Sequence, residues 1–176
     1  MKIFFDTEFI EDGKTIDLVS IGMVREDGVE FYAESRDADL SRASPWVKEN
    51  VFPHLYSLMA DKSEGNAWFR DGGKGGYLSR TEIASGIMDF AGEDPEFWAD
   101  FASYDWVALC QLFGPMIDLP KGWPFFCRDV QQLRKQLGVP KFTVIQHGEH
   151  NALSDARECK ARHDVLQGKF VELISK

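Results

Sequence analysis

The chain has 176 residues, of which 44% are hydrophobic and 28% are charged, as in ordinary globular proteins. No run of residues approaches the ~20 apolar positions that a membrane-spanning helix needs, and no apolar segment with a cleavage site follows the N-terminus. We therefore expect neither a membrane protein nor a secretory leader, and one domain over residues 1–176.

Cysteine content and charge further restrict the class of protein that this chain can be. Cys110, Cys127 and Cys159 are odd in number and form no C-x-x-C pair, so neither a disulfide framework nor a zinc site is expected, and a cytoplasmic location fits best. The net charge is −9, but residues 1–120 hold 10 Lys+Arg against 23 Asp+Glu, whereas residues 121–176 hold 10 against 6. A protein this acidic is not expected to coat a long nucleic acid, although it could hold a strand end over a small footprint.

Three strands are expected at the start of the chain, over Lys2–Phe5, Ile16–Arg25 and Val29–Glu34. Asp27-Gly28 lies between the second and third strands and is a strong hairpin signal, so an antiparallel meander is predicted. Ser44–Val51 opens with Ser-Pro, a favourable N-cap and first-turn pair, and should form a short helix.

Residues 61–76 contain five glycines and are expected to form a mobile surface loop. A phosphate-binding P-loop would require G-x-x-x-x-G-K followed by Ser or Thr. Lys74 is followed by Gly75, which excludes that motif.

The rest of the chain alternates between helices and strands. Ser79 and Glu82 form a potential capping box at the start of the first of these helices. Helices are expected over Ser79–Ala91, Asp105–Phe113, Asp129–Leu137 and Asn151–Ser175, and strands over Glu96–Phe101 and Phe125–Arg128. The order predicts an α/β fold with a mixed five-stranded sheet, antiparallel in its first three strands and flanked by helices.

Acidic residues follow two of the predicted strands. Asp6 and Glu8 follow the predicted strand at Lys2–Phe5. Residues two apart on an extended chain point to the same side, so their carboxylates should lie together. Asp105 follows the strand at residues 96–101 and heads a helix, which places it at the edge where ligand sites of such sheets occur. Each signal is weak alone, since chance predicts about one D-x-E pair and Asp105 could simply be an N-cap.

His150 and Asp155 flank the start of the last helix. With Asn151 as N-cap, His150 is N′ and Asp155 is N4, two positions that touch across the first helical turn. A histidine and a carboxylate can therefore share one water or metal ion. None of the other histidines has an acid five residues later.

Together these residues form a recognisable pattern. A D-x-E pair near the N-terminus, an Asp after a later strand and H-x-x-x-x-D at the last helix resemble the DEDDh branch of the DnaQ-like 3′–5′ exonucleases. The DEDDy branch would need Y-x-x-x-D, which none of the four tyrosines provides. The segments FFDTEFIEDG, YDWVALCQLFGPMIDLP and HNALSDARECKARHD are similar to the small bacterial and phage exoribonucleases of the RNase AS type, which shorten RNA 3′ ends, including adenylate-rich ones.

The resemblance implies an RNase H-like fold and a set of roles. Asp6, Glu8, Asp105 and Asp155 would hold two Mg²⁺ or Mn²⁺ ions, and His150 would take a proton from the attacking water. The product would be a nucleoside 5′-monophosphate. Thr7 and Phe9, together with Asp6, Glu8 and His150, would contact the terminal nucleotide, although Phe9 could equally be a core residue.

The expected partner is an RNA 3′ end, single-stranded or overhanging, and the segregated charges are compatible with a homodimer. Two alternatives stay open at this point. One is a DNA 3′–5′ exonuclease of the same branch, and the other is a nucleotide-binding module without catalysis. A metal-free acid–base pair of Asp6 and Glu8 is disfavoured, because carboxyls two apart on a strand are too close and too alike.

Overall fold

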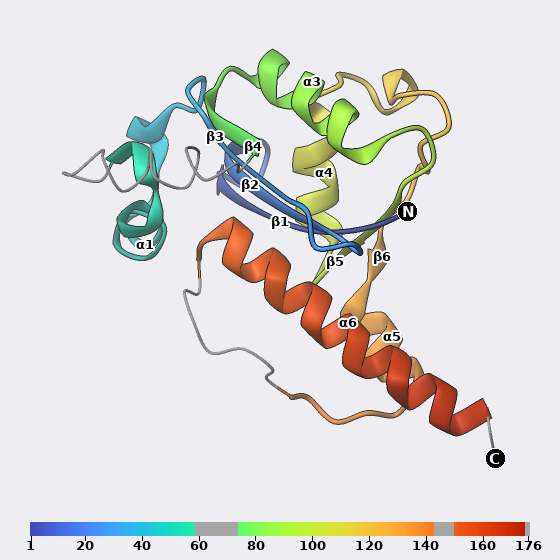
Figure 1. Cartoon of the computed structure of the whole chain (residues 1–176). Coiled ribbons are helices and arrows are strands. Elements are labelled where there is room, and N and C mark those ends of the chain that lie inside the picture. Colours follow the sequence, from blue (N-terminus) through green and yellow to red (C-terminus); the bar gives the residue numbers. More distant parts are fainter. Residues whose placement is uncertain (59–73, 143–149, 175–176) are drawn as a thin grey trace.

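The structure is a computed structural model that describes residues 1–58, 74–142 and 150–174. A central sheet runs in the order β4-β3-β2-β1-β5-β6 and has helices on both sides (Figure 1). The strands are β1 (Lys2–Glu11), β2 (Ile16–Arg25), β3 (Glu30–Ser35), β4 (Lys74–Leu78), β5 (Glu96–Ala99) and β6 (Arg128–Asp129). The helices are α1 (Pro45–Asn50), α3 (Arg80–Ala91), α4 (Ser103–Gln111), α5 (Val130–Gln136) and α6 (Ala152–Ile174), with 3-10 turns η1 (Leu40–Arg42), η2 (Phe52–His54), η3 (Tyr56–Leu58) and η4 (Met116–Asp118).

The predicted mixed sheet is confirmed, with β1, β2 and β3 antiparallel and β5 and β6 parallel to β1. The described part of the chain holds six strands rather than the predicted five, because β4 pairs in parallel with β3. Residues 74–76, predicted to belong to a loop, are therefore strand residues. A Cβ at Gly75 would lie 1.7 Å from the Tyr32 carbonyl oxygen, so glycine is what permits this pairing. The remainder of the predicted loop lies outside the described residues.

Strand β1 is longer than predicted, since it continues to Glu11 instead of ending at Phe5. Asp6 and Glu8 therefore lie within the strand and pair with Gly22 and Ser20 of β2. The apolar pattern stops at Phe5, but backbone pairing with β2 carries the strand through the polar residues. A register shift between Glu8 and Phe9 marks a bulge, a feature that re-aims side chains near functional sites.

The helix-start predictions are confirmed at three places. The Ser44 side chain caps α1, Ser79 and Glu82 form the capping box of α3, and Asp129 caps α5. Other boundaries differ from the prediction, and two of them concern elements next to the site. Helix α4 begins at residue 103, so position 105 lies inside its first turn, and β6 covers residues 128–129 only. Phe125 and Phe126 were predicted to be strand residues, but they precede β6 and are largely exposed.

Alternation along β1 divides the core between the two faces of the sheet. Ile3 and Phe5 pack in the core under α3 and α4, whereas Phe4 packs with Trp98 and Leu166 in the core under α5 and α6. Helices α3 and α4 cover one face and α5 and α6 cover the other (Figure 1). Among the described helices, none is both long enough and apolar enough to cross a bilayer.

Candidate active site

Three carboxylates meet where β1 passes the start of α6. Asp6 and Glu8 share the β1 face of Phe4, which is the face that α6 covers, and Asp155 lies in the first turn of α6. One oxygen from each of the three lies within 4.8 Å of the others. The period of two in β1 and the first turn of α6 thus bring residues 149 positions apart into one cluster.

This close approach of helix to sheet depends on Gly22, which pairs with Asp6. A Cβ at position 22 would lie 2.3 Å from backbone atoms of both Ala152 and Leu153. The absent side chain therefore lets the start of α6 lie directly on β2, which brings Asp155 to Asp6. Gly22 was not among the residues predicted to matter for the site, because no sequence pattern around it indicates a close contact with a helix.

Asp105 reaches the site from the opposite face of the sheet. It is buried in the first turn of α4, and its Oδ1 accepts hydrogen bonds from the Thr7 amide at 2.9 Å and the Thr7 hydroxyl at 2.7 Å. Thr7 is the middle residue of the D-x-E tripeptide, so the strand segment that carries Asp6 and Glu8 also binds Asp105. Asp105 is thus bound to β1 rather than serving as the N-cap of α4, a position that Ala102 occupies.

His150 immediately precedes α6. Its φ of +66° is left-handed, an uncommon conformation for a residue with a side chain, and its amide donates to Asp155 Oδ2 at 3.0 Å. Asn151 is the expected N-cap, because its Oδ1 accepts from the Ser154 amide at 3.1 Å. The Asn151 side-chain amide also donates to the His54 carbonyl at 3.3 Å, which ties the start of α6 to η2.

Three acids of the site, Asp6, Glu8 and Asp105, have raised pKa values. Burial raises the pKa of Asp6 well above its ordinary value, and the nearby carboxylates of Asp105, Asp155 and Glu8 raise it further. Burial, with Asp155 and Asp105 adding to it, raises the pKa of Glu8 to about 8. Burial also raises the pKa of Asp105 to about 6, against the opposing effect of the Thr7 hydrogen bonds. Crowded carboxylates of this kind suit a divalent cation, which would offset their repulsion.

Aromatic side chains line the same cavity, which has a volume of about 360 Å³. Phe9 and Tyr104 stack with ring centroids 5.7 Å apart, and Trp46 meets His150 edge to face at 4.8 Å. Phe101 has a left-handed φ of +58° and a 68% exposed side chain. Of these aromatics the sequence singled out only Phe9. The others are hard to identify, because exposure decides their role and the sequence does not report it.

An adjoining hollow of about 340 Å³ shares Asp6, His150 and Asp155 and adds an ion-pair network. Arg162 pairs with Asp100 and, at 2.7 Å, with Glu158. Arg162 is the one cationic side chain lining either hollow in the described part of the chain. It therefore offsets part of the negative charge next to the cluster, and the sequence analysis named none of these three residues.

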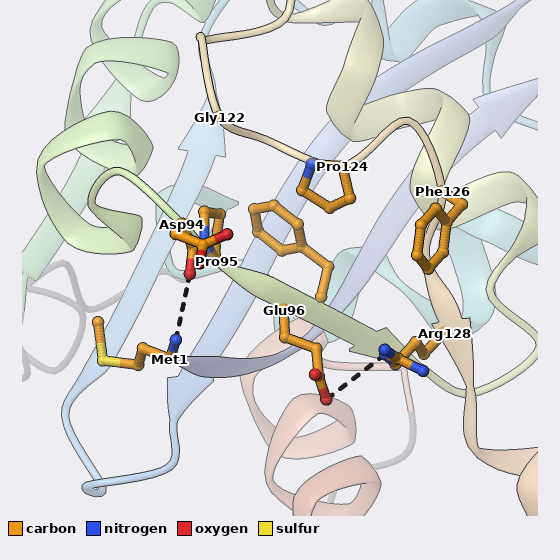
Figure 2. Close-up of a pocket in the computed structure, with 9 residues that line it drawn as sticks. Met1, Asp94, Pro95, Glu96, Gly122, Pro124, Phe126 and Arg128 are labelled. Carbon is orange, nitrogen blue, oxygen red and sulfur yellow. Dashed lines mark hydrogen bonds and ion pairs between the residues drawn. The ribbon is translucent and has the colours of Figure 1, made fainter.

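A separate cavity of about 270 Å³ lies at the other end of the strands, where β1 and β5 begin (Figure 2). There the Met1 ammonium donates to the Asp94 carbonyl at 3.2 Å, and Arg128 pairs with Glu96 at 3.5 Å. Both charged groups are satisfied by neighbours, and none of the predicted site residues lines this cavity. The acidic cluster is therefore the candidate active site.

Buried acids from one strand and two helix starts, with a histidine beside them, are typical of nucleases that act on phosphodiesters with divalent cations. Comparison with known proteins gives the family. Residues 1–166 match the model described as the 3′–5′ exoribonuclease Rv2179c-like domain. The chain is 42% identical over 162 residues to the 3′–5′ exoribonucleases Rv2179c and MT2234.1 of two Mycobacterium tuberculosis strains, H37Rv and CDC 1551, covering 90% of this chain and 88% of each relative. The chain belongs to this exoribonuclease family, and its fold is α/β with a mixed sheet between helices.

Two solved structures show more distant similarity. The catalytic unit of Neurospora crassa Pan2, containing protease and nuclease domains, aligns with 99% of this chain and 29% of its own, at a TM-score of 0.42 and 14% identity. Yeast NOT1 MIF4G domain co-crystallised with CAF1 aligns with 94% of this chain and 80% of its own, at a TM-score of 0.43 and 10% identity. The family assignment comes from the family model and the mycobacterial relatives alone.

Proposed function

We propose that this enzyme removes nucleotides one at a time from RNA 3′ ends, releasing nucleoside 5′-monophosphates with the help of two divalent cations. The observation that carries the proposal is the approach of Asp6, Glu8 and Asp155 oxygens to within 4.8 Å, with Asp105 lining the same cavity. Hard carboxylate oxygens favour Mg²⁺ or Mn²⁺ over zinc. Burial and the repulsion among neighbouring carboxylates raise the pKa values of Asp6 and Glu8, and a bound cation would offset that repulsion.

Asp6, Glu8 and Asp155 would hold one ion, and Asp6 with Asp105 would hold the other. Bound cations of this kind stabilise negative charge on the attacking and leaving oxygens of a phosphodiester. The α4 and α6 helix starts assist, because the partial positive charge at a helix N-terminus favours the carboxylates of Asp105 and Asp155. Thr7 contributes by fixing Asp105 through two hydrogen bonds.

We assign His150 the role of general base that accepts a proton from the attacking water. Histidine is the side chain used most often as a general base in enzymes. His150 lines the same cavity as the acids, and its amide is bonded to Asp155. Phe9, stacked on Tyr104 in the wall of the cavity, would lie against the terminal nucleotide.

We further propose a cytoplasmic homodimer. Cys110, Cys127 and Cys159 are free thiols, which suits a reducing compartment. Val165 and Phe170 of α6 are 42% and 44% exposed, and the cations of the C-terminal third could guide a strand toward a partner's site. Light scattering of the purified protein tests the dimer, and a monomeric mass at assay concentration would contradict it.

The function is tested by a time course on matched RNA and DNA oligonucleotides in Mg²⁺ or Mn²⁺, with products identified by mass. We expect 5′-monophosphates from the 3′ end of RNA, no reaction in EDTA, and none from a folded Asp6→Asn variant. Faster release from DNA would favour the DNA exonuclease of the same branch. Binding of RNA with no mononucleotide release under any condition would favour a nucleotide-binding module.

A further inference from the structure

The orientation of the His150 imidazole is not set by the acids that line the same cavity. The His150 backbone is fixed, because its amide donates to Asp155 and its neighbour Asn151 is bonded to the His54 carbonyl. The ring nitrogens, in contrast, make no hydrogen bond with any residue in the ranges 1–58, 74–142 and 150–174. Something else must restrict the ring if it is to face the acids.

The neighbour that meets this ring is Trp46. The indole and imidazole ring centroids are 4.8 Å apart with an interplanar angle of 81°, a favourable edge-to-face arrangement. Both side chains line the cavity that contains Asp6, Glu8 and Asp155. The indole therefore occupies space into which the imidazole would otherwise turn.

Trp46 is itself held in place by the element that carries it. Helix α1 is capped by Ser44, whose Oγ accepts from the Val47 amide at 3.2 Å, and Pro45 stands in its first turn. Val47 packs in a small core with Ile10, a residue of the strand that carries Asp6 and Glu8. The backbone that carries the indole is thus fixed relative to the strand of Asp6 and Glu8, although Trp46 itself is 53% exposed.

We propose that Trp46 is a positioning residue, which restricts rotation of the His150 imidazole within the cavity that contains the acidic cluster. The inference rests on the proposed function, in which His150 is the general base. An imidazole free to rotate spends less time within hydrogen-bond reach of the attacking water, so the loss of Trp46 lowers the rate of the chemical step. A tryptophan that only stacked on a base would instead set the affinity for RNA.

The test compares Trp46→Leu and Trp46→Phe with wild type on an RNA oligonucleotide and on bis(p-nitrophenyl) phosphate, which has no base. We expect Trp46→Leu to lower kcat about 10- to 100-fold on both substrates, with KM changed less than about twofold, since misplacement of a catalytic group costs up to about 100-fold. Trp46→Phe, which keeps an aromatic ring, should recover most of the rate. Phe126→Leu, another exposed aromatic at the opposite end of β5, is the matched control and should be unchanged.

The same substitution made in a His150→Ala background separates the two roles of Trp46. If Trp46 acts through His150, Trp46→Leu has no further effect on kcat there. An equal loss in both backgrounds, or a raised KM for RNA with an unchanged rate on the small substrate, would overturn the proposal. Thermal unfolding of each variant identifies any loss caused by misfolding. Failure of wild type to release mononucleotides would count against the proposed function itself.

Discussion

Asp6 and Glu8 are held in an environment that disfavours their negative charge, and their burial therefore makes the stability of the protein depend on pH. The folded-state pKa of Glu8 is about 8, compared with an ordinary value near 4.3. A carboxyl with a raised folded-state pKa contributes stability that is complete below its unfolded pKa and is lost as pH rises through the folded value. The pKa of Asp6 is also raised, so its contribution to stability is likewise lost as pH rises.

We therefore predict that, in EDTA, the free energy of unfolding falls between pH 5 and pH 8. Glu8→Gln and Asp6→Asn should each flatten this fall and be more stable than wild type at pH 8, because one repelling charge is gone. Urea unfolding at several pH values measures the free energy of unfolding of each protein. Adding Mn²⁺ should reverse the order, stabilising wild type more than either variant. Parallel profiles for all three proteins would contradict the prediction.

Thr7 offers a second test at the scale of single residues. Thr7→Val keeps the branched shape but removes the hydroxyl that donates to Asp105 at 2.7 Å. Because a hydrogen bond to a buried charged group contributes ~1.5–3 kcal/mol, we expect a stability loss in that range and roughly tenfold lower kcat.

Thr7→Ser is the control for this substitution, since it retains the hydroxyl and should retain most of the activity. Rates are measured by mononucleotide release at saturating RNA. If valine and serine behave alike, the hydroxyl does not fix Asp105.

Some of these residue contacts could be predicted from sequence. The adjacency of Asp6 and Glu8 follows from the period of two in an extended chain, and the Asn151 cap follows from helix-start rules. The bond between Thr7 and Asp105 could not be predicted, since these residues are 98 positions apart and no local pattern links them. Contacts of that kind depend on how the helix packs on the sheet.

At the scale of elements, the site depends on how closely α6 approaches β2. We predict that Gly22→Ala pushes the start of α6 away, because the new Cβ would meet the backbone of residues 152–153 at 2.3 Å. Overpacking of this kind costs ~1–3 kcal/mol, and displacement of Asp155 should lower activity about 100-fold.

Gly168→Ala is the matched control within α6, since nothing lies within 4 Å of its position and the residue is exposed. Alanine is favoured over glycine inside a helix by ~1 kcal/mol, so this variant should raise Tm with unchanged activity. Equal behaviour of the two variants would show that the close approach at Gly22 is not required.

The element boundaries show what local patterns can and cannot predict. The strand at 16–25 and the helix from 152 agree with expectation because their hydrophobic periods and caps are strong. Strand β1 was predicted too short because Asp6 to Glu8 interrupt its apolar run, although β2 pairs with them. Strand β4 was missed because its glycines have no strand propensity and are suited instead to close contact with β3.

At the scale of the whole molecule, an acidic enzyme must bind a polyanion. The net charge is −9, and Arg162 is the one cation lining the two hollows among the described residues, where it already pairs with Asp100. Few direct phosphate contacts are therefore available, and each contact to a single strand contributes about −0.7 to the salt slope.

We predict that log(kcat/KM) falls with log[NaCl] at a slope shallower than about −3, corresponding to roughly four phosphates or fewer. This slope is measured from initial rates on one RNA oligonucleotide between 50 and 400 mM NaCl, at fixed Mn²⁺. A slope as steep as about −6 would indicate an extended phosphate-binding surface.

Helix α6 has one more property of practical use. It begins at the acids and runs 23 residues away from them, and at 1.5 Å per residue it spans about 35 Å (Figure 1). A fluorophore or surface tether attached beyond Ile174 would therefore start far from the cleavage chemistry. Immobilised single molecules could then be watched as they shorten a labelled strand, with the reaction centre still open to solution.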